Sequence, residues 1–117
     1  MKRDLDLIRE LLFLIESQED DRKELKLPPE MDRNVAVYHL DLLEQAGYTK
    51  NKIQYADNEP MWIHSTITWD GHEFLDAVRN ESVWNKVKDT AKEKGGGIPF
   101  EVLKALAIKL SEKIFLG

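Results

Sequence analysis

Three histidines are the side chains of this sequence best suited to metal binding or acid–base chemistry. They are His39, His64 and His72. No two of them are four residues apart, the spacing that brings a histidine pair to one face of a helix, and no HExxH motif occurs. The sequence therefore predicts no metal site. We expect His39, which follows Tyr38 in a helical segment, to be a packing residue.

The serines and glycines form no pattern for covalent catalysis or phosphate binding. The serines lack the glycine-flanked context of a nucleophile elbow. The glycine run 95–97 is followed by Ile98 and Pro99, not by the Lys-Ser/Thr pair of a phosphate-binding loop, so we expect a helix end and hinge there. The chain has no cysteine, which excludes thiol chemistry. These observations predict a protein that is not an enzyme and has no catalytic residue, metal or cofactor.

The distribution of charged residues along the sequence argues against a strongly basic surface. The 117 residues include 17 Lys and Arg against 22 Asp and Glu, a net charge of -5. Segment 31–46 carries a net charge of -2, segment 47–60 is neutral, and segments 81–97 and 98–117 carry +1 each. Phosphate neutralisation dominates affinity for nucleic acid, so this distribution favours DNA only weakly. The candidate DNA contacts that remain are Arg33, Asn34, Lys50 and Lys52.

The three tryptophans have two interpretations, as base-stacking residues or as anchors in a core or interface. Trp84 falls on the apolar seam of a predicted helix. Trp69 falls on the inward face of a predicted hairpin, and Trp62 falls on the opposite face. We therefore expect Trp62 to be exposed and to contact a partner.

Hydrophobic spacing and turn residues predict five helices, a short strand and a hairpin. The expected helices cover 4–16 and 32–46, open at 68–71, follow a break at 80–82, and begin at Pro99. The short strand is expected over 23–27, and the hairpin has arms 48–55 and 61–69 around a turn at 57–60. Gly47, just past the second helix, is expected in a left-handed conformation.

This order of elements is that of a winged helix-turn-helix domain. The expected class is α+β, mostly helical, with a winged helix-turn-helix-like core and a β-hairpin wing. Only residues 28–33 are left for the second helix of the motif, so that helix is truncated, and its absence weakens the case for ordinary DNA docking. We expect a winged-helix-like core over 1–80 and a C-terminal helical hairpin over 81–117.

The last helix carries a broad apolar sector that includes Leu106, Leu110 and Ile114. This sector needs a cover, either the core of the same chain or a partner subunit. Packing across a two-fold axis would make a homodimer, and these three residues are candidate partner-binding residues together with Trp62.

Several stretches of the sequence carry a family resemblance. They are MKRDLDLIR at 1–9, VYHL at 37–40, ITWDGHEFL at 67–75, VWNKVK at 83–88 and PFEVLKAL at 99–106. The chain resembles a family of short proteins of unknown function from bacteria and their phages. The resemblance implies a winged-helix-like fold and a phage or mobile-element context, and it implies no substrate.

Two functions remain open from the sequence. One is a small DNA-associated transcriptional regulator that binds double-stranded DNA, and the other is a protein-interaction adaptor that makes no DNA contact. No apolar run approaches the ~18–20 residues of a membrane span, so we expect no membrane contact and a cytoplasmic protein.

Overall fold

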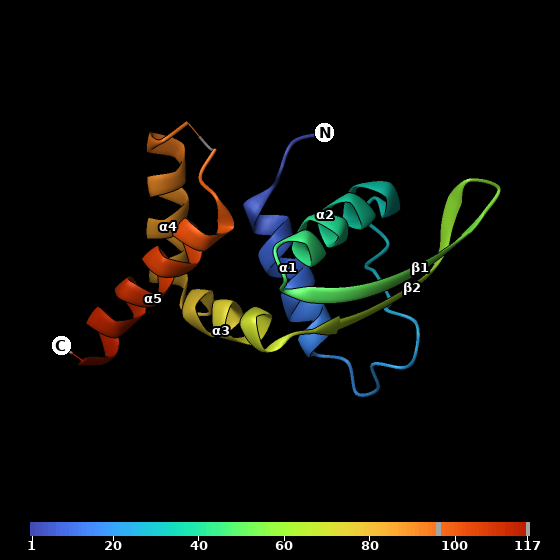
Figure 1. Cartoon of the computed structure of the whole chain (residues 1–117), viewed down its shortest axis with the longest axis horizontal. Helices are drawn as coiled ribbons and strands as arrows, with labels where there is room; N and C mark the ends of the chain where they lie inside the picture. The colour runs from blue at the N-terminus through green and yellow to red at the C-terminus, as the bar shows by residue number, and fades with distance from the viewer. Residues whose placement is uncertain (96, 117) are drawn as a thin grey trace. The chain divides into compact units, whose positions relative to one another are not determined.

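The computed structural model describes residues 1–95 and 97–116, which form five α-helices and one antiparallel hairpin (Figure 1). The elements are α1 (Leu5–Glu16), α2 (Arg33–Gln45), β1 (Thr49–Ala56), β2 (Glu59–Ile67), α3 (Trp69–Val78), α4 (Glu81–Glu93) and α5 (Phe100–Leu116). The predicted α+β, mostly helical class, with a hairpin and two further C-terminal helices, is confirmed.

The chain divides into two compact units, Met1–Gly71 and His72–Gly117. The first unit holds α1, α2, the hairpin and the first turn of α3. The second holds the rest of α3 with α4 and α5. The ranges expected from the sequence, 1–80 and 81–117, stay a prediction about folding units.

The core of the first unit lies between α1, α2 and the hairpin. Asp4 and Asp32 cap the two helices, because their carboxylates accept hydrogen bonds from the backbone N–H groups of Leu7 and Val35. The buried apolar residues of these elements are Ile8, Leu11, Leu12, Ile15, Ala36, Val37, Leu40, Leu43 and Ile63. The core therefore closes without any contribution from the charged outer side of α2.

Helix α2 ends in a glycine-dependent turn that leads directly into the hairpin. Gly47 has a φ of 84°, as expected for a left-handed position. Its N–H donates to the Glu44 carbonyl at 2.9 Å, and the Tyr48 N–H donates to the Leu43 carbonyl at 2.9 Å. This pair of bonds is a Schellman motif, and it sets the direction in which β1 leaves the helix.

The hairpin turns through only two residues. Asp57 and Asn58 have φ values of 53° and 65°, so both are left-handed, which is the conformation of a tight type I′ connection. Glu59 and Pro60 belong to β2, although the sequence predicted them in the turn. The reason is that Asn tolerates the left-handed region well enough for the turn to need no third residue.

The predicted short strand over 23–27 is wrong. Leu25 is buried, and its N–H donates to the Ile63 carbonyl of β2 at 2.7 Å, but no ladder follows from this bond. Pro28 and Pro29 come directly after the segment 23–27, and they lack the N–H groups that a longer strand would donate. Between α1 and α2 the described chain has turns closed by the Lys23 and Met31 N–H groups but no helix, in agreement with the expected truncation of an element there.

In the second unit α4 packs against α5. The side chain of Asn80 caps α4 by accepting from the N–H groups of Ser82 and Val83. The predicted seam of α4 is buried, namely Val83, Trp84, Val87 and Ala91. Helix α5 begins at Phe100, one residue after the predicted start. Of the glycine run, Gly96 lies outside the described residues.

Candidate functional site

The outer face of the hairpin gathers side chains that the sequence treated separately. The register pairs Lys50 with Thr66, Lys52 with His64 and Gln54 with Trp62. Residues directly opposite each other in an antiparallel ladder point to the same side of the sheet. One face therefore carries two lysines, an amide, a threonine and two aromatic rings, and we call this set of six residues the outer face.

Trp62 and His64 form a stacked pair on this outer face. Their ring centroids are 5.6 Å apart and their planes differ by 17°. The Trp62 side chain is nevertheless 47% exposed, so the indole is covered on one side and open to solvent elsewhere. A large aromatic surface held in place and left accessible is typical of a binding residue.

The lysines beside this aromatic pair are available for an anionic partner. Lys50 and Lys52 are exposed, and no ion pair in the described part of the chain involves either of them. Their positions two residues apart on β1 put both ammonium groups on the same side of the strand. Lys52 is directly opposite His64 and diagonal to Trp62, which is within reach of a long side chain.

The inner face of the hairpin is tied to the helices by a polar network. The Asn51 side-chain amide donates to the Leu40 carbonyl at 2.7 Å, and its oxygen accepts from the Ser65 hydroxyl at 2.6 Å. The Gln18 side chain then donates to the Ser65 carbonyl at 3.0 Å. This network holds both strands against α1 and α2, so the outer face stands on a fixed support.

A β-bulge at Met61 decides which residues share the outer face. Gln54 pairs with Trp62 and Tyr55 pairs with Pro60, which leaves Met61 as the extra residue. Met61 is 53% exposed, although strict period-two alternation along β2 would place it on the same side as buried Ile63.

The candidate DNA contact Arg33 supports this bulge. Its guanidinium donates to the Met61 carbonyl at 3.1 Å and forms an ion pair with Glu24 at 3.2 Å. Arg33 therefore already has two partners within the first unit, and its geometry is that of a residue that positions the hairpin. The sequence could not show this, because Glu24 and Met61 are distant from Arg33 along the chain.

The outer side of α2 lacks the basic character of a DNA-reading helix. Asn34 is exposed at its start, away from the lysines in sequence, and Asp41 is exposed in its middle. Partial burial raises the pKa of Asp41, and the nearby charge of Glu44 raises it further. The Glu44 carboxylate accepts a hydrogen bond from the Asn51 N–H at 2.7 Å, so it stabilises the start of the hairpin.

The other two tryptophans differ in burial. Trp84 is 1% exposed, in agreement with its predicted place on a helix seam. Trp69 is 79% exposed, so the expected inward orientation is wrong. The reason is that β2 ends at Ile67, and Trp69 is the first residue of α3, where strand alternation no longer applies.

His39 has a structural position. It is fully buried on α2, its Nε2 accepts from the Asp4 N–H at 2.8 Å, and its Nδ1 donates to the Val35 carbonyl at 2.8 Å. The Nε2 contact thus joins α2 to the N-cap of α1, and the Nδ1 contact lies within α2. No group of three or more His, Cys, Asp or Glu residues suited to a metal ion occurs within 1–95 and 97–116.

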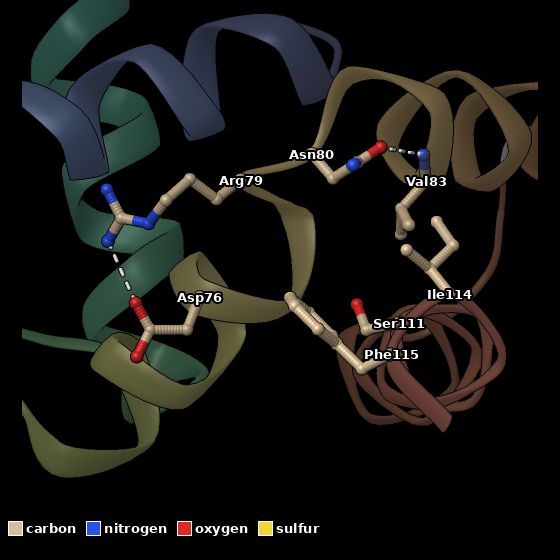
Figure 2. A pocket seen from close by; sticks show the side chains of 7 residues that line it. All are labelled: Asp76, Arg79, Asn80, Val83, Ser111, Ile114 and Phe115. Atoms are coloured by element: carbon tan, nitrogen blue, oxygen red, sulfur yellow. Dashed lines mark hydrogen bonds and ion pairs between the residues drawn. The ribbon is translucent and has the colours of Figure 1, made fainter. Parts of the chain in front are cut away.

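The second unit contains an open, mainly apolar pocket of about 280 Å³. Figure 2 shows its lining, with Ile114, Phe115 and Ser111 of α5 opposite Val83 of α4. The other lining residues are Asp76 and Arg79, which form an ion pair at 2.8 Å, and Asn80. Of the candidate partner-binding residues on α5, Ile114 is 50% exposed, whereas Leu106 and Leu110 are half-buried.

Three residues of the outer face are not among the candidates that the sequence offers, namely Gln54, His64 and Thr66. The sequence suggests His64 only as a metal ligand, and it suggests no role for Gln54 or Thr66. Period-two alternation places His64 beside Trp62, and that signal was present in the sequence. The same alternation places Gln54 on the side of Lys50 and Lys52, whereas its place opposite Trp62 depends on the bulge.

The fold and the hairpin define a small α+β protein that carries its exposed aromatic and basic residues on a two-stranded wing. A family model described as "Hypothetical protein (DUF2513)" matches residues 2–97, and the chain belongs to this family. It is 40% identical over 111 residues to a Haemophilus influenzae protein described as "Uncharacterized protein", with 92% of each chain covered. No solved structure matches the chain. The likeness to winged-helix domains thus rests on the order of elements, and the phage context stays a prediction.

No helix in the described ranges is long and apolar enough to cross a membrane.

Proposed function

We propose that this protein is a non-enzymatic binding module that contacts nucleic acid through the outer face of its hairpin. The observation that supports the proposal is the combination of two unpaired lysines with the stacked Trp62–His64 pair on one face. Lysines neutralise backbone phosphates, and aromatic rings contact bases. A small DNA-associated regulator is the biological role that such a module would fill.

The proposal shifts the contact away from α2. Arg33 is held by Glu24 and by the Met61 carbonyl, and the outer side of α2 carries Asp41 and Glu44. A helix with this charge would repel phosphate, whereas Lys50 and Lys52 have no acidic partner in the described residues. The wing is therefore better suited than α2 to an anionic polymer, despite the net charge of -5.

The proposal is tested by fluorescence anisotropy with labelled DNA, both single-stranded and duplex, at about 50 mM salt, where phosphate contacts are strong. Protein is added up to millimolar concentration because two lysines support only weak binding. We expect binding that is lost in the double variant Lys50→Glu/Lys52→Glu. The matched control is Lys86→Glu/Lys109→Glu, which makes the same change of charge on exposed positions of α4 and α5. Absence of binding to both single-stranded and duplex DNA would overturn the proposal.

A second function, protein–protein interaction, is favoured by the end of α5. Ile114, Phe115 and Leu116 are 50%, 83% and 83% exposed, and the first two line the pocket of the second unit. Large exposed apolar side chains in sequence are typical of an interface. We propose a second copy of the chain as the partner, and light scattering at high concentration should then report twice 13.6 kDa. A species of 13.6 kDa at every concentration would contradict the dimer.

A further inference from the structure

We propose that the ligand of the outer face is a single-stranded nucleic acid, with one unpaired base stacked on the side of Trp62 that His64 does not cover. This inference rests on the proposed function, and it names the class of nucleic acid that this function left open. The sequence interpretation offered double-stranded DNA, whereas the geometry of the outer face points to unpaired bases.

The stacked pair is the first reason. In a duplex each base is already covered by its neighbours, so a flat aromatic ring gains a contact only if a base step is opened at a cost in free energy. In a single strand the base faces are free, and stacking on an aromatic side chain is insensitive to sequence. Trp62 presents such a surface in an ordered orientation, because its other side already lies on His64 with planes 17° apart.

The residues around Trp62 supply what a nucleotide needs besides stacking. Gln54 is directly opposite Trp62 and exposed, and its amide has both donors and an acceptor for the edge of a base. Lys52 is diagonal to Trp62, and Lys50 lies two residues earlier on the same side of β1. A base on Trp62 would therefore leave its phosphates on the side of the two lysines.

The support beneath the face argues for binding without rearrangement. Asn51 and Ser65 hold the two strands to the helices from the inner side, and Arg33 holds the carbonyl of the bulge. Ordering costs reduce affinity when a site must form on binding, so a preformed face retains more of its contact energy. One stack and two phosphate contacts still support only weak binding, on the order of 0.1–1 mM.

NMR on the full chain tests the inference with a readout for each tryptophan. The chain has three tryptophans, so the indole N–H region holds three signals, and Trp62→Phe identifies the one from Trp62. On titration with a short oligothymidylate we expect the Trp62 signal to shift. The signals of exposed Trp69 and buried Trp84 serve as internal controls and should stay in place. Oligouridylate in a parallel titration distinguishes RNA from DNA as the source of the unpaired base.

Variants separate stacking from charge. We expect Trp62→Thr to weaken binding of the oligonucleotide about tenfold or more, while Trp62→Phe retains most of it and Trp69→Thr leaves it unchanged. The salt dependence should have a log–log slope of about -1.4, from two phosphate contacts on a single strand. The slope should approach zero when Lys50 and Lys52 are both replaced by Gln.

A duplex of mixed sequence distinguishes failure of this inference from failure of the proposed function. Duplex binding that equals single-strand binding and is unchanged in Trp62→Thr would overturn the single-strand inference, and it would leave the outer face a nucleic-acid contact through its lysines. Absence of any shift with single strands, RNA or duplex would overturn both. Weak or absent duplex binding beside a Trp62-dependent single-strand shift supports the inference.

Discussion

The two faces of the β1–β2 hairpin differ in what their side chains contact. On the inner face Ile63 and Ser65 are almost fully buried, and Asn51 bonds to both a helix and the opposite strand. On the outer face Lys52 and Trp62 reach solvent. Side chains that alternate along the same two strands therefore divide into residues that stabilise the unit and residues that are free to bind. Substitutions on the two faces should separate stability from binding.

The largest effect is expected from the apolar residue at the centre of the inner face. Ile63→Ala should lower the free energy of unfolding by about 2–5 kcal/mol, because Ile63 is fully buried and its removal leaves a cavity. Urea unfolding followed by circular dichroism measures this loss. The outer-face control Trp62→Thr should change stability by less than about 1 kcal/mol. Equal losses in the two variants would break the comparison.

The second effect concerns the amide that joins the inner face to α2. Asn51→Ala should cost about 1–3 kcal/mol, because the Leu40 carbonyl and the Ser65 hydroxyl both lose their partner. The matched control is Gln54→Ala, which removes an exposed amide from the outer face of the same strand and should cost less than about 0.5 kcal/mol. Thermal unfolding of both variants in parallel gives the comparison. A cost for Gln54→Ala as large as that for Asn51→Ala would contradict it.

The third effect separates a positioning role of Arg33 from direct contact with phosphate. Arg33→Gln should cost about 1 kcal/mol through loss of the bonds to Met61 and Glu24. It should weaken oligonucleotide binding without changing the salt slope, because no phosphate contact is removed. A slope smaller in magnitude by about 0.7 would instead assign Arg33 to a phosphate on a single strand.

The control for this variant is a second arginine that pairs with a carboxylate in the same unit. Arg22 forms an ion pair with Asp20 at 3.2 Å, and its side chain is 88% exposed. Asp20 lies in the loop after α1, so this pair is formed outside the hairpin. Arg22→Gln should therefore change stability by less than about 0.5 kcal/mol. It should also leave oligonucleotide binding and its salt slope unchanged.

The smallest effect is a dependence of stability on pH from α2. The pKa of Asp41 is raised in the folded chain, first by burial and then by Glu44. The folded chain thus holds this proton more tightly than the unfolded chain, so ionised Asp41 destabilises the fold above its folded pKa. Asp41→Asn should gain a few tenths of a kcal/mol at pH 7, since water screens an exposed group. The gain should disappear below the ordinary pKa of Asp, and urea midpoints at both pH values measure it.

Much of the fold could be predicted from local patterns. The helix caps Asp4 and Asp32, the left-handed Gly47 and the buried seam of α4 follow from signals within a few residues. Some errors arose at the ends of elements, as for Trp69, and others arose where a residue contacts one that is distant in the sequence. Leu25 has strand-like neighbours but finds one partner at Ile63 instead of a ladder.

The candidate site was predicted in pieces. Strand alternation predicts an exposed Trp62, and the charge distribution singles out Lys50 and Lys52, but the sequence assigns Trp62 and the lysines to different kinds of partner. Arg33 was assigned to DNA because basic residues at a helix start suit phosphate, and its role changed when Glu24 and Met61 were found beside it. Charge type was thus predictable, whereas the partner of each charge was not.

The sequence by itself determined the five helices and the hairpin of this protein, the absence of thiol chemistry, and an acidic α2 followed by a wing with two lysines. The tertiary structure alone decided that these lysines share a face with Trp62 and His64. A two-residue turn without the bulge would pair Lys52 with Ile63 and place the lysines on the buried side. Because side chains alternate with a period of two, the single extra residue Met61 reverses that assignment, and its carbonyl is held by a residue distant in the sequence.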